Sequence, residues 1–185
     1  MARTETPICN FGEIAPDFNL PGVDGRMWSR DDCCGPAGLL VMFICNHCPY
    51  VKAINHKLVR DAVDLAELGI NSVAIMSNDP ADYPEDSFEN MKAVAREMNY
   101  PFPYLVDESQ EVAKAYGAVC TPDFFGYNKG LELQYRGRLD QSGRSADLEG
   151  VKRELFLAMK QVAETGRGPL DQVPSIGCSI KWRDF

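Results

Sequence analysis

Two strand-like apolar runs, joined by a segment with helical periodicity, constrain the fold of this chain more than any other feature. The runs read GLLVMFI at 38–44 and NSVAIMS at 71–77. Between them, apolar residues recur every three or four positions over 49–68, and Gly69 is well placed to end a helix. Strands without polar alternation are typical of a sheet covered on both faces, and two such strands connected through a helix run parallel. The sequence therefore predicts a β-α-β unit in a sheet packed between helices.

The same alternation continues toward the C-terminus. The predicted elements are a helix at 87–99, a strand at 104–107, a helix at 109–117, two strands at 123–128 and 131–140 joined by a turn, and a helix at 147–166. Nearer the N-terminus, PGVDGR at 21–26 is typical of a turn between two short strands. This order predicts an α/β fold in three layers, with a mixed central sheet and an N-terminal β-hairpin.

The domain is expected to span residues 1–166. Residues 167–185 contain the apolar, cysteine-bearing stretch GCSIKW, which a disordered end would not need. We therefore expect these residues to form an ordered C-terminal tail packed on the domain, where their apolar area is buried.

The charge of the chain bears on its partners. Formal net charge is −8 and the sequence pI is about 4.8, whereas nucleic acids and anionic membranes bind basic surfaces. The start MARTETPICN has no apolar leader region, and no apolar run approaches the roughly 18 residues of a membrane span. We expect a cytoplasmic protein that binds neither nucleic acid nor membrane.

Seven cysteines, an odd number, argue against a disulfide framework in a chain without an export signal. Reduced thiols, redox cysteines or a metal site remain. Free cysteine is among the most buried residue types, so Cys9, Cys33 and Cys34 are expected to pack as small apolar side chains.

The strongest chemical signal is FICNHCPYVKA at 43–53, where a predicted strand runs straight into a predicted helix. The unpaired N–H groups and the dipole at a helix N-terminus favour an anion, so a cysteine there is rich in thiolate. Cys48 occupies this place, with Pro49 suited to the first helical turn. Cys45 lies one short turn earlier. His47 between them either supplies positive charge or faces solvent.

Three stretches carry a resemblance to a known family: IAPDF at 14–18 followed by DGR at 24–26, VMFICNHCPYVKA at 41–53, and YGAVCTPDFFGYNKG at 116–130. With them, the chain resembles the thioredoxin-like superfamily, and within it the redoxin branch of TlpA-like and peroxiredoxin-like (AhpC/TSA-type) proteins. Bacterial proteins described as thiol-disulfide isomerases or thioredoxins share NxCPYV and GCxIKW. The resemblance covers roughly residues 12–165 and implies a thioredoxin-like three-layer α/β/α fold. It also implies a cis peptide bond before Pro122 that brings the backbone against the attacking sulfur.

This chain departs from both familiar active-site patterns of the branch. Aligned with thioredoxins, Cys48 matches the attacking cysteine, but Val51 stands where the resolving cysteine belongs. Aligned with the peroxiredoxin pattern PxxxTxxC, Cys48 is again the reactive cysteine, while Cys45 and Val41 replace the threonine and the proline. Cys48 is therefore the expected nucleophile in either alignment.

The resolving cysteine stays open among three residues. Cys45 is nearest in sequence and ranks first, because its loop permits the Cα separation that a disulfide needs. Cys120 ranks second, since the resemblance puts it beside the site just before Thr121 and Pro122. Cys178 ranks third, on the condition that the tail folds back over the site.

These residues indicate an enzyme, a thiol-disulfide oxidoreductase without a cofactor. Its expected partners are a protein or small-molecule disulfide as substrate and a cellular thiol as electron donor. The alternatives are a thiol peroxidase in which Cys48 becomes a sulfenic acid, a binding module without chemistry, and a metal site formed by Cys45, Cys48, Cys120 and Cys178. Arg136 and Arg138 would share a face of a strand, where they either steady a thiolate or an anionic substrate or remain solvated.

Overall fold

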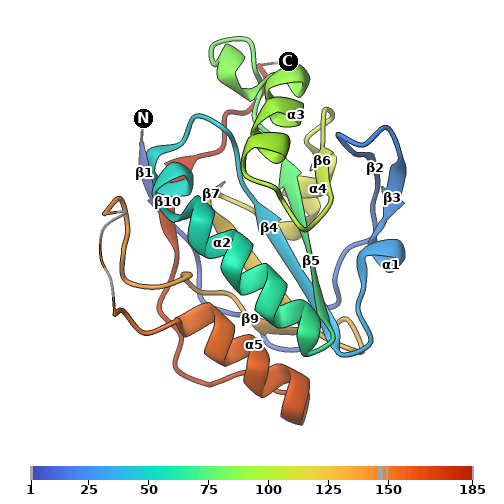
Figure 1. Cartoon of the computed structure of the whole chain (residues 1–185), viewed down its shortest axis with the longest axis vertical. Coiled ribbons are helices and arrows are strands. Elements are labelled where there is room, and N and C mark those ends of the chain that lie inside the picture. Colours follow the sequence, from blue (N-terminus) through green and yellow to red (C-terminus); the bar gives the residue numbers. More distant parts are fainter. Residues whose placement is uncertain (1, 146–147, 149, 185) are drawn as a thin grey trace.

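The central sheet contains five strands, in the order β6-β5-β4-β8-β9, in a computed structural model that describes residues 2–145, 148 and 150–184 (Figure 1). Its strands are β4 (Gly38–Phe43), β5 (Ile70–Met76), β6 (Tyr104–Val106), β8 (Asp123–Asn128) and β9 (Leu133–Tyr135). The first three run parallel, whereas β8 and β9 are antiparallel to their neighbours. The predicted β-α-β unit and the mixed sheet are thus confirmed.

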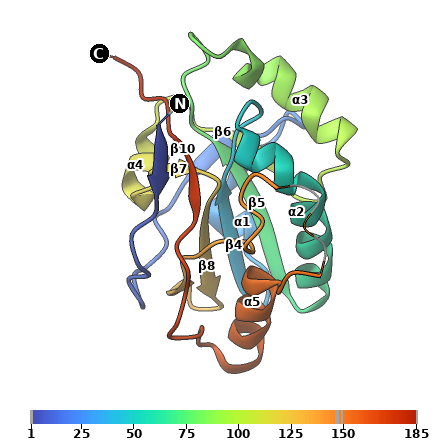
Figure 2. The same ribbon diagram turned by 90° about the vertical axis from the view of Figure 1, so that its left-hand side faces the viewer.

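Helices cover both faces of this sheet (Figures 1 and 2). On one face lie α2 (Pro49–Glu67), α3 (Phe88–Glu97) and α5 (Glu154–Thr165), and on the other lie the short α1 (Arg30–Cys33) and α4 (Glu111–Tyr116). A 3₁₀ turn, η1 (Pro84–Asp86), precedes α3. The three-layer α/β/α arrangement predicted from the sequence is confirmed.

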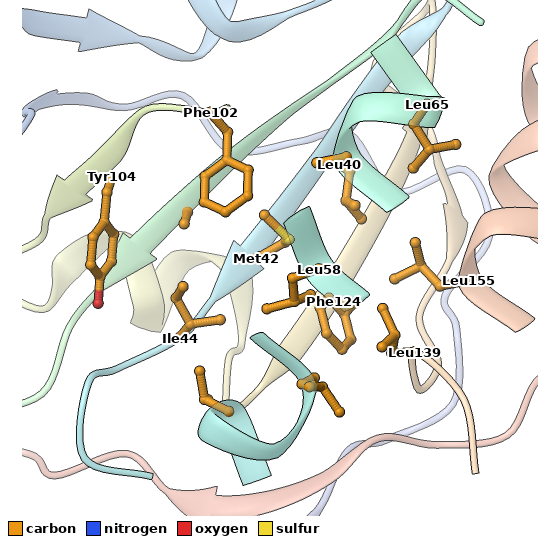
Figure 3. Close-up of a cluster of buried hydrophobic side chains, with 14 of the residues drawn as sticks. Leu40, Met42, Ile44, Leu58, Leu65, Phe102, Tyr104, Phe124, Leu139 and Leu155 are labelled. Carbon is orange, nitrogen blue, oxygen red and sulfur yellow. The ribbon is translucent and has the colours of Figure 1, made fainter. Parts of the chain in front are cut away.

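Strand β4 explains why the chain forms two cores rather than one. Its six residues are all buried, and successive side chains point to opposite faces. Leu40 and Met42 join the cluster beneath α2 and α5, and Figure 3 shows them packed among Leu58, Phe124 and Leu155. The alternate residues of β4, Leu39 and Val41 among them, join the second cluster, beneath α4. The apolar run at 38–44 therefore lacks polar alternation because both faces are covered.

Two smaller sheets flank the central one. β2 (Asn19–Pro21) and β3 (Met27–Ser29) form the predicted N-terminal hairpin. A second sheet has the order β1-β10-β7, with β1 (Arg3–Glu5), β7 (Cys120–Thr121) and β10 (Ile176–Ser179) side by side in Figure 2. The tail thus lies between the first residues of the chain and the segment that leads into β8.

Two predicted elements are shorter than their sequence patterns suggested. The strand predicted over 131–140 spans only Leu133–Tyr135, because the backbone N–H of Arg136 turns away to the Gln172 side chain. The helix predicted over 147–166 begins at Glu154. Residues 147 and 149 lie outside the described residues, and Gly150 has φ of 70°, a left-handed conformation that interrupts a helix. In the part of the chain that is described, none of the helices has the length and apolarity needed to cross a lipid bilayer.

Candidate active site

Cys48 is the N-cap residue of α2, and Pro49 occupies the first helical position, as predicted. The Cys48 side chain is fully buried, and its sulfur lies 3.1 Å from the carbonyl oxygen of Thr121. Hydrogen bonding to the Cys45 thiol, together with a weaker bond to the Cys178 thiol, outweighs burial and lowers the pKa of Cys48 to about 5. Cys48 is therefore a thiolate at neutral pH, which is the nucleophilic form.

Cys178 of the tail contacts Cys48 directly. The two sulfur atoms are 3.1 Å apart, and β10 places Cys178 opposite Thr121 in an antiparallel pair. Burial and the neighbouring Cys48 raise the pKa of Cys178 to about 12, so this thiol keeps its proton. The sequence ranking put Cys178 third, yet the fold brings its sulfur into direct contact with that of Cys48.

The peptide bond between Thr121 and Pro122 is cis, as the resemblance implied. It separates β7 from β8, and the Thr121 backbone faces Cys48 across the site. The Thr121 hydroxyl lies 3.3 Å from the Cys45 sulfur. Thr121 therefore contacts both cysteines of the FICNHCPYVKA segment.

Cys45 is buried, like Cys48. Its hydrogen bond to Cys48, burial and the negative charge of Asp86 raise the pKa of Cys45 well above the ordinary value. Its sulfur also lies 3.8 Å from Nδ1 of His47. Cys45 thus remains a protonated thiol and a hydrogen-bond donor to the Cys48 thiolate.

Asp86, at the end of η1, organises the loop that carries these cysteines. Its fully buried carboxylate accepts the backbone N–H groups of Asn46 and His47, at 2.8 and 3.1 Å. It also contacts Nδ1 of His47 at 2.5 Å and accepts the amide of Asn78 at 2.9 Å. Although burial opposes ionisation, these hydrogen bonds keep the pKa of Asp86 below its usual value.

His47 has a role that the sequence alternatives did not include. It faces the interior, where its ring pairs with Asp86 and stacks on Tyr83 with ring centroids 4.3 Å apart. Nε2 of His47 is buried and finds no hydrogen-bond partner among the described residues. The ring therefore packs in the interior and stabilises the loop instead of facing solvent.

The four-cysteine metal site considered from the sequence is not formed. Among the described residues, no three of these cysteines have sulfur atoms within 4.8 Å of one another. The group that does meet this spacing is Cys45, His47 and Asp86. Its His47–Asp86 contact of 2.5 Å is too short for an ion between them, because two ligands at about 2.0 Å in a tetrahedral site lie about 3.3 Å apart.

Cys120 lies in β7, where it pairs with Ser179 of β10. Its thiol is buried and lies 3.5 Å from the carbonyl oxygen of Pro122, and burial raises its pKa far above the usual range. Cys120, ranked second as the resolving cysteine, is thus a buried, protonated thiol that contacts the Pro122 carbonyl. Cys33 is buried in the cluster beneath α4, and Cys9 and Cys34 pack against that cluster, as expected.

Arg136 and Arg138 do not share a face, because β9 ends at Tyr135. Arg136 is buried and pairs with Asp123, the first residue of β8, at 3.0 Å. Arg138 pairs with Glu154 at the start of α5, at 2.8 Å. The guanidinium groups thus bind carboxylates of the fold.

Two solved structures resemble this one along almost its whole length, and others share its fold over a smaller part. An uncharacterized conserved protein from Geobacillus kaustophilus is 49% identical with a TM-score of 0.93, and the match covers 99% of this chain and 97% of that one. A hypothetical protein from Sinorhizobium meliloti 1021 is 40% identical with a TM-score of 0.92, covering 97% and 98%. The thioredoxin domain of a thiol-disulfide oxidoreductase from Bacteroides vulgatus is 17% identical with a TM-score of 0.57, covering 68% and 86%, which shows the fold alone. No curated protein matches the chain.

The three-layer fold, the cis-proline and the thiolate at the start of α2 define a redox protein of the thioredoxin fold. The sequence matches the model of the AhpC/TSA family over residues 11–154. The chain belongs to the AhpC/TSA family, which confirms the resemblance to the redoxin branch. Cys178 lies in the tail, beyond the matched residues.

Proposed function

We propose that this protein is a thiol-disulfide oxidoreductase in which Cys48 is the nucleophile and Cys178 resolves. The observation that carries the proposal is the 3.1 Å contact between a thiolate and a protonated thiol. A disulfide bond is about 2.0 Å long, so the two sulfur atoms need to approach by only about 1 Å.

The reaction balances with these two residues. The Cys48 thiolate attacks one sulfur of a substrate disulfide, forming a mixed disulfide and releasing one thiolate. Cys178 then loses its proton and attacks the Cys48 sulfur, which forms the Cys48–Cys178 disulfide and releases the second thiol. Two electrons pass from the protein to the substrate, and a cellular thiol returns them.

Cys45 is assigned a different part in this proposal. Its hydrogen bond to Cys48 is the leading cause of the lowered Cys48 pKa and so stabilises the thiolate. Thr121 also holds its sulfur, at 3.3 Å. The proposal therefore treats Cys45 as a positioning residue.

The test is the stoichiometry of a single turnover. Pre-reduced protein is mixed with 2-hydroxyethyl disulfide, and the released thiol is counted after subtracting the Cys48→Ser background. Wild type should release two equivalents, Cys178→Ser one, and the remote control Cys33→Ser two. If Cys178→Ser released two equivalents of thiol and Cys45→Ser only one, Cys45 would be the resolving cysteine. If wild type released no thiol above the Cys48→Ser background, the proposal would be refuted.

A thiol peroxidase is the second candidate, and family membership favours it. A peroxide is small enough to suit a fully buried Cys48, whose sulfenic acid Cys178 would convert to the same disulfide with loss of water. Comparing the second-order rates at which Cys48 is consumed by hydrogen peroxide and by 2-hydroxyethyl disulfide separates the two. A much faster peroxide reaction would make peroxidase the better description.

A further inference from the structure

The strand edge beside the active site is already occupied. Thr121 presents the backbone that faces Cys48, and a polypeptide substrate would most simply dock there by adding a strand. β10 fills this edge, pairing Cys178 with Thr121 and Ser179 with Cys120, and β1 covers the other side of β10. The tail thus lies where a protein substrate would bind.

Gly177 allows the tail to lie this close. A Cβ atom at this residue would stand 2.1 Å from the carbonyl oxygen of Thr121 and 2.6 Å from its carbonyl carbon. These neighbours are backbone atoms next to the cis-proline and cannot rotate away. Any residue with a side chain at position 177 must therefore push β10 off the edge or move the Thr121–Pro122 peptide.

A small cavity adjoins the same site. It has a volume of about 110 Å³, and Tyr50, Pro122 and Ile176 are among its lining residues. Tyr50 is two positions after Cys48, Pro122 follows Thr121, and Ile176 is two positions before Cys178. Ile54, Phe124 and Leu139 add apolar wall. Its charged lining side chains, Arg138 and Asp140, are already paired with Glu154 and Lys57. The cavity can admit a compact, weakly polar molecule and cannot hold a folded chain.

We infer that the substrate is a low-molecular-weight disulfide, and that β10, held in place through Gly177, excludes protein disulfides. This inference rests on the proposed function and specifies its substrate class. Cys48 attacks one sulfur of the small disulfide and releases one thiolate. Cys178 gives up its proton and displaces the second, which leaves as the free thiol.

The test compares two probes on pre-reduced, full-length protein. Consumption of the Cys48 thiol is followed by quenching with an alkylating agent and mass spectrometry, with 2-hydroxyethyl disulfide or insulin at equal disulfide concentration. Wild type should react with insulin about tenfold or more slowly, since only molecules with β10 displaced can bind it. Gly177→Val should raise the rate with insulin, so that the ratio of the 2-hydroxyethyl disulfide rate to the insulin rate becomes smaller. The control Leu170→Ala, at an exposed tail position, should leave this ratio unchanged.

The outcomes distinguish failure of the substrate inference from failure of the proposed function. Equal wild-type rates with the two probes would overturn the inference and leave the proposed function standing. An unchanged ratio in Gly177→Val, with hydrogen exchange showing 176–179 released, would also overturn it. Should Gly177→Val fail to fold, Gly177→Ala introduces the same backbone clash with the smallest side chain. A Cys48 that reacts with neither probe would refute the proposed function itself.

Discussion

The sulfur atoms of Cys48 and Cys178 lie 3.1 Å apart, although 130 positions separate the two residues in the chain. They hold opposite protonation states at neutral pH, with pKa values of about 5 and about 12. Strongly shifted pKa values in neighbouring groups are typical of functional sites, where one group acts as the nucleophile and the other holds a proton. The tail strand therefore completes the site that the N-terminus of α2 begins.

Alkylation of Cys48 should follow the fraction of thiolate. Because this pKa is lowered to about 5, the rate with iodoacetamide should be level at neutral pH and fall about tenfold per unit once the pH drops below about 5. Mass spectrometry of the Cys48 peptide measures the rate. The same peptide in urea should titrate near the ordinary value of about 8.5. A native midpoint at or above 8 would contradict the assignment.

The stability of the reduced protein should depend on pH through the same residue. The folded pKa of Cys48 lies below the unfolded one, so the thiolate contributes stability fully above about 9, and this contribution is lost as the pH falls toward 5. The difference in unfolding free energy between wild type and Cys48→Ser, from urea titrations, should therefore increase from pH 5 to pH 9. A difference that does not change over this range would show that the native thiolate is not stabilised.

Cys45 should control the acidity of Cys48. Its thiol is the leading cause of the low pKa, so Cys45→Ala should shift the alkylation midpoint of Cys48 upward. Cys45→Ser retains a donor of similar size and should shift it less. Cys33→Ala, on the opposite face of the sheet, is the matched control and should leave the midpoint unchanged. Equal alkylation midpoints in Cys45→Ala and wild type would show that Cys45 does not lower the pKa of Cys48.

Asp86 should be essential for the stability of the active-site loop. Asp86→Ala leaves the N–H groups of Asn46 and His47 without their buried acceptor, which should cost about 3 kcal/mol or more of unfolding free energy. Urea denaturation measures this cost, and the exposed neighbour Glu85→Ala should change it little. A loss equal to that of Glu85→Ala would contradict the role given to Asp86.

Arg136 and Arg138 should differ in their effect on stability. Arg136→Ala leaves Asp123 as an unpaired buried charge and should cost about 3 kcal/mol or more. Arg138→Ala breaks a partly exposed pair with Glu154 and should cost about 1 kcal/mol or less. Thermal or urea unfolding of the two variants provides the comparison. Similar losses of unfolding free energy in the two variants would contradict the larger cost expected for the buried Arg136–Asp123 pair.

Much of the fold could be predicted from the sequence because the signals are local. The apolar run of β4 and the helical spacing of α2 specify their elements, and the strand-to-helix junction places Cys48 without further information. The prediction of 147–166 as one helix was too long because apolar spacing does not register the left-handed Gly150. Periodicity marks the type of an element better than its ends.

The second half of the site could not be ranked in the same way. The contact between Cys48 and Cys178 depends on the register of β10 against β7, which no local pattern records. Asp86 was missed because an acidic residue in a polar loop has no sequence signal that distinguishes a buried carboxylate from a solvated one. Gly177 offers a partial signal, since glycine within a strand often marks a close backbone approach.

Disulfide mapping after mild oxidation tests the central claim most directly. Reduced protein is treated with one equivalent of a small disulfide, trapped by alkylation under denaturing conditions and analysed by mass spectrometry. The structure predicts a Cys48–Cys178 bond as the main product, with Cys45 and Cys120 alkylated as free thiols. A Cys45–Cys48 or Cys48–Cys120 bond in its place would contradict the account.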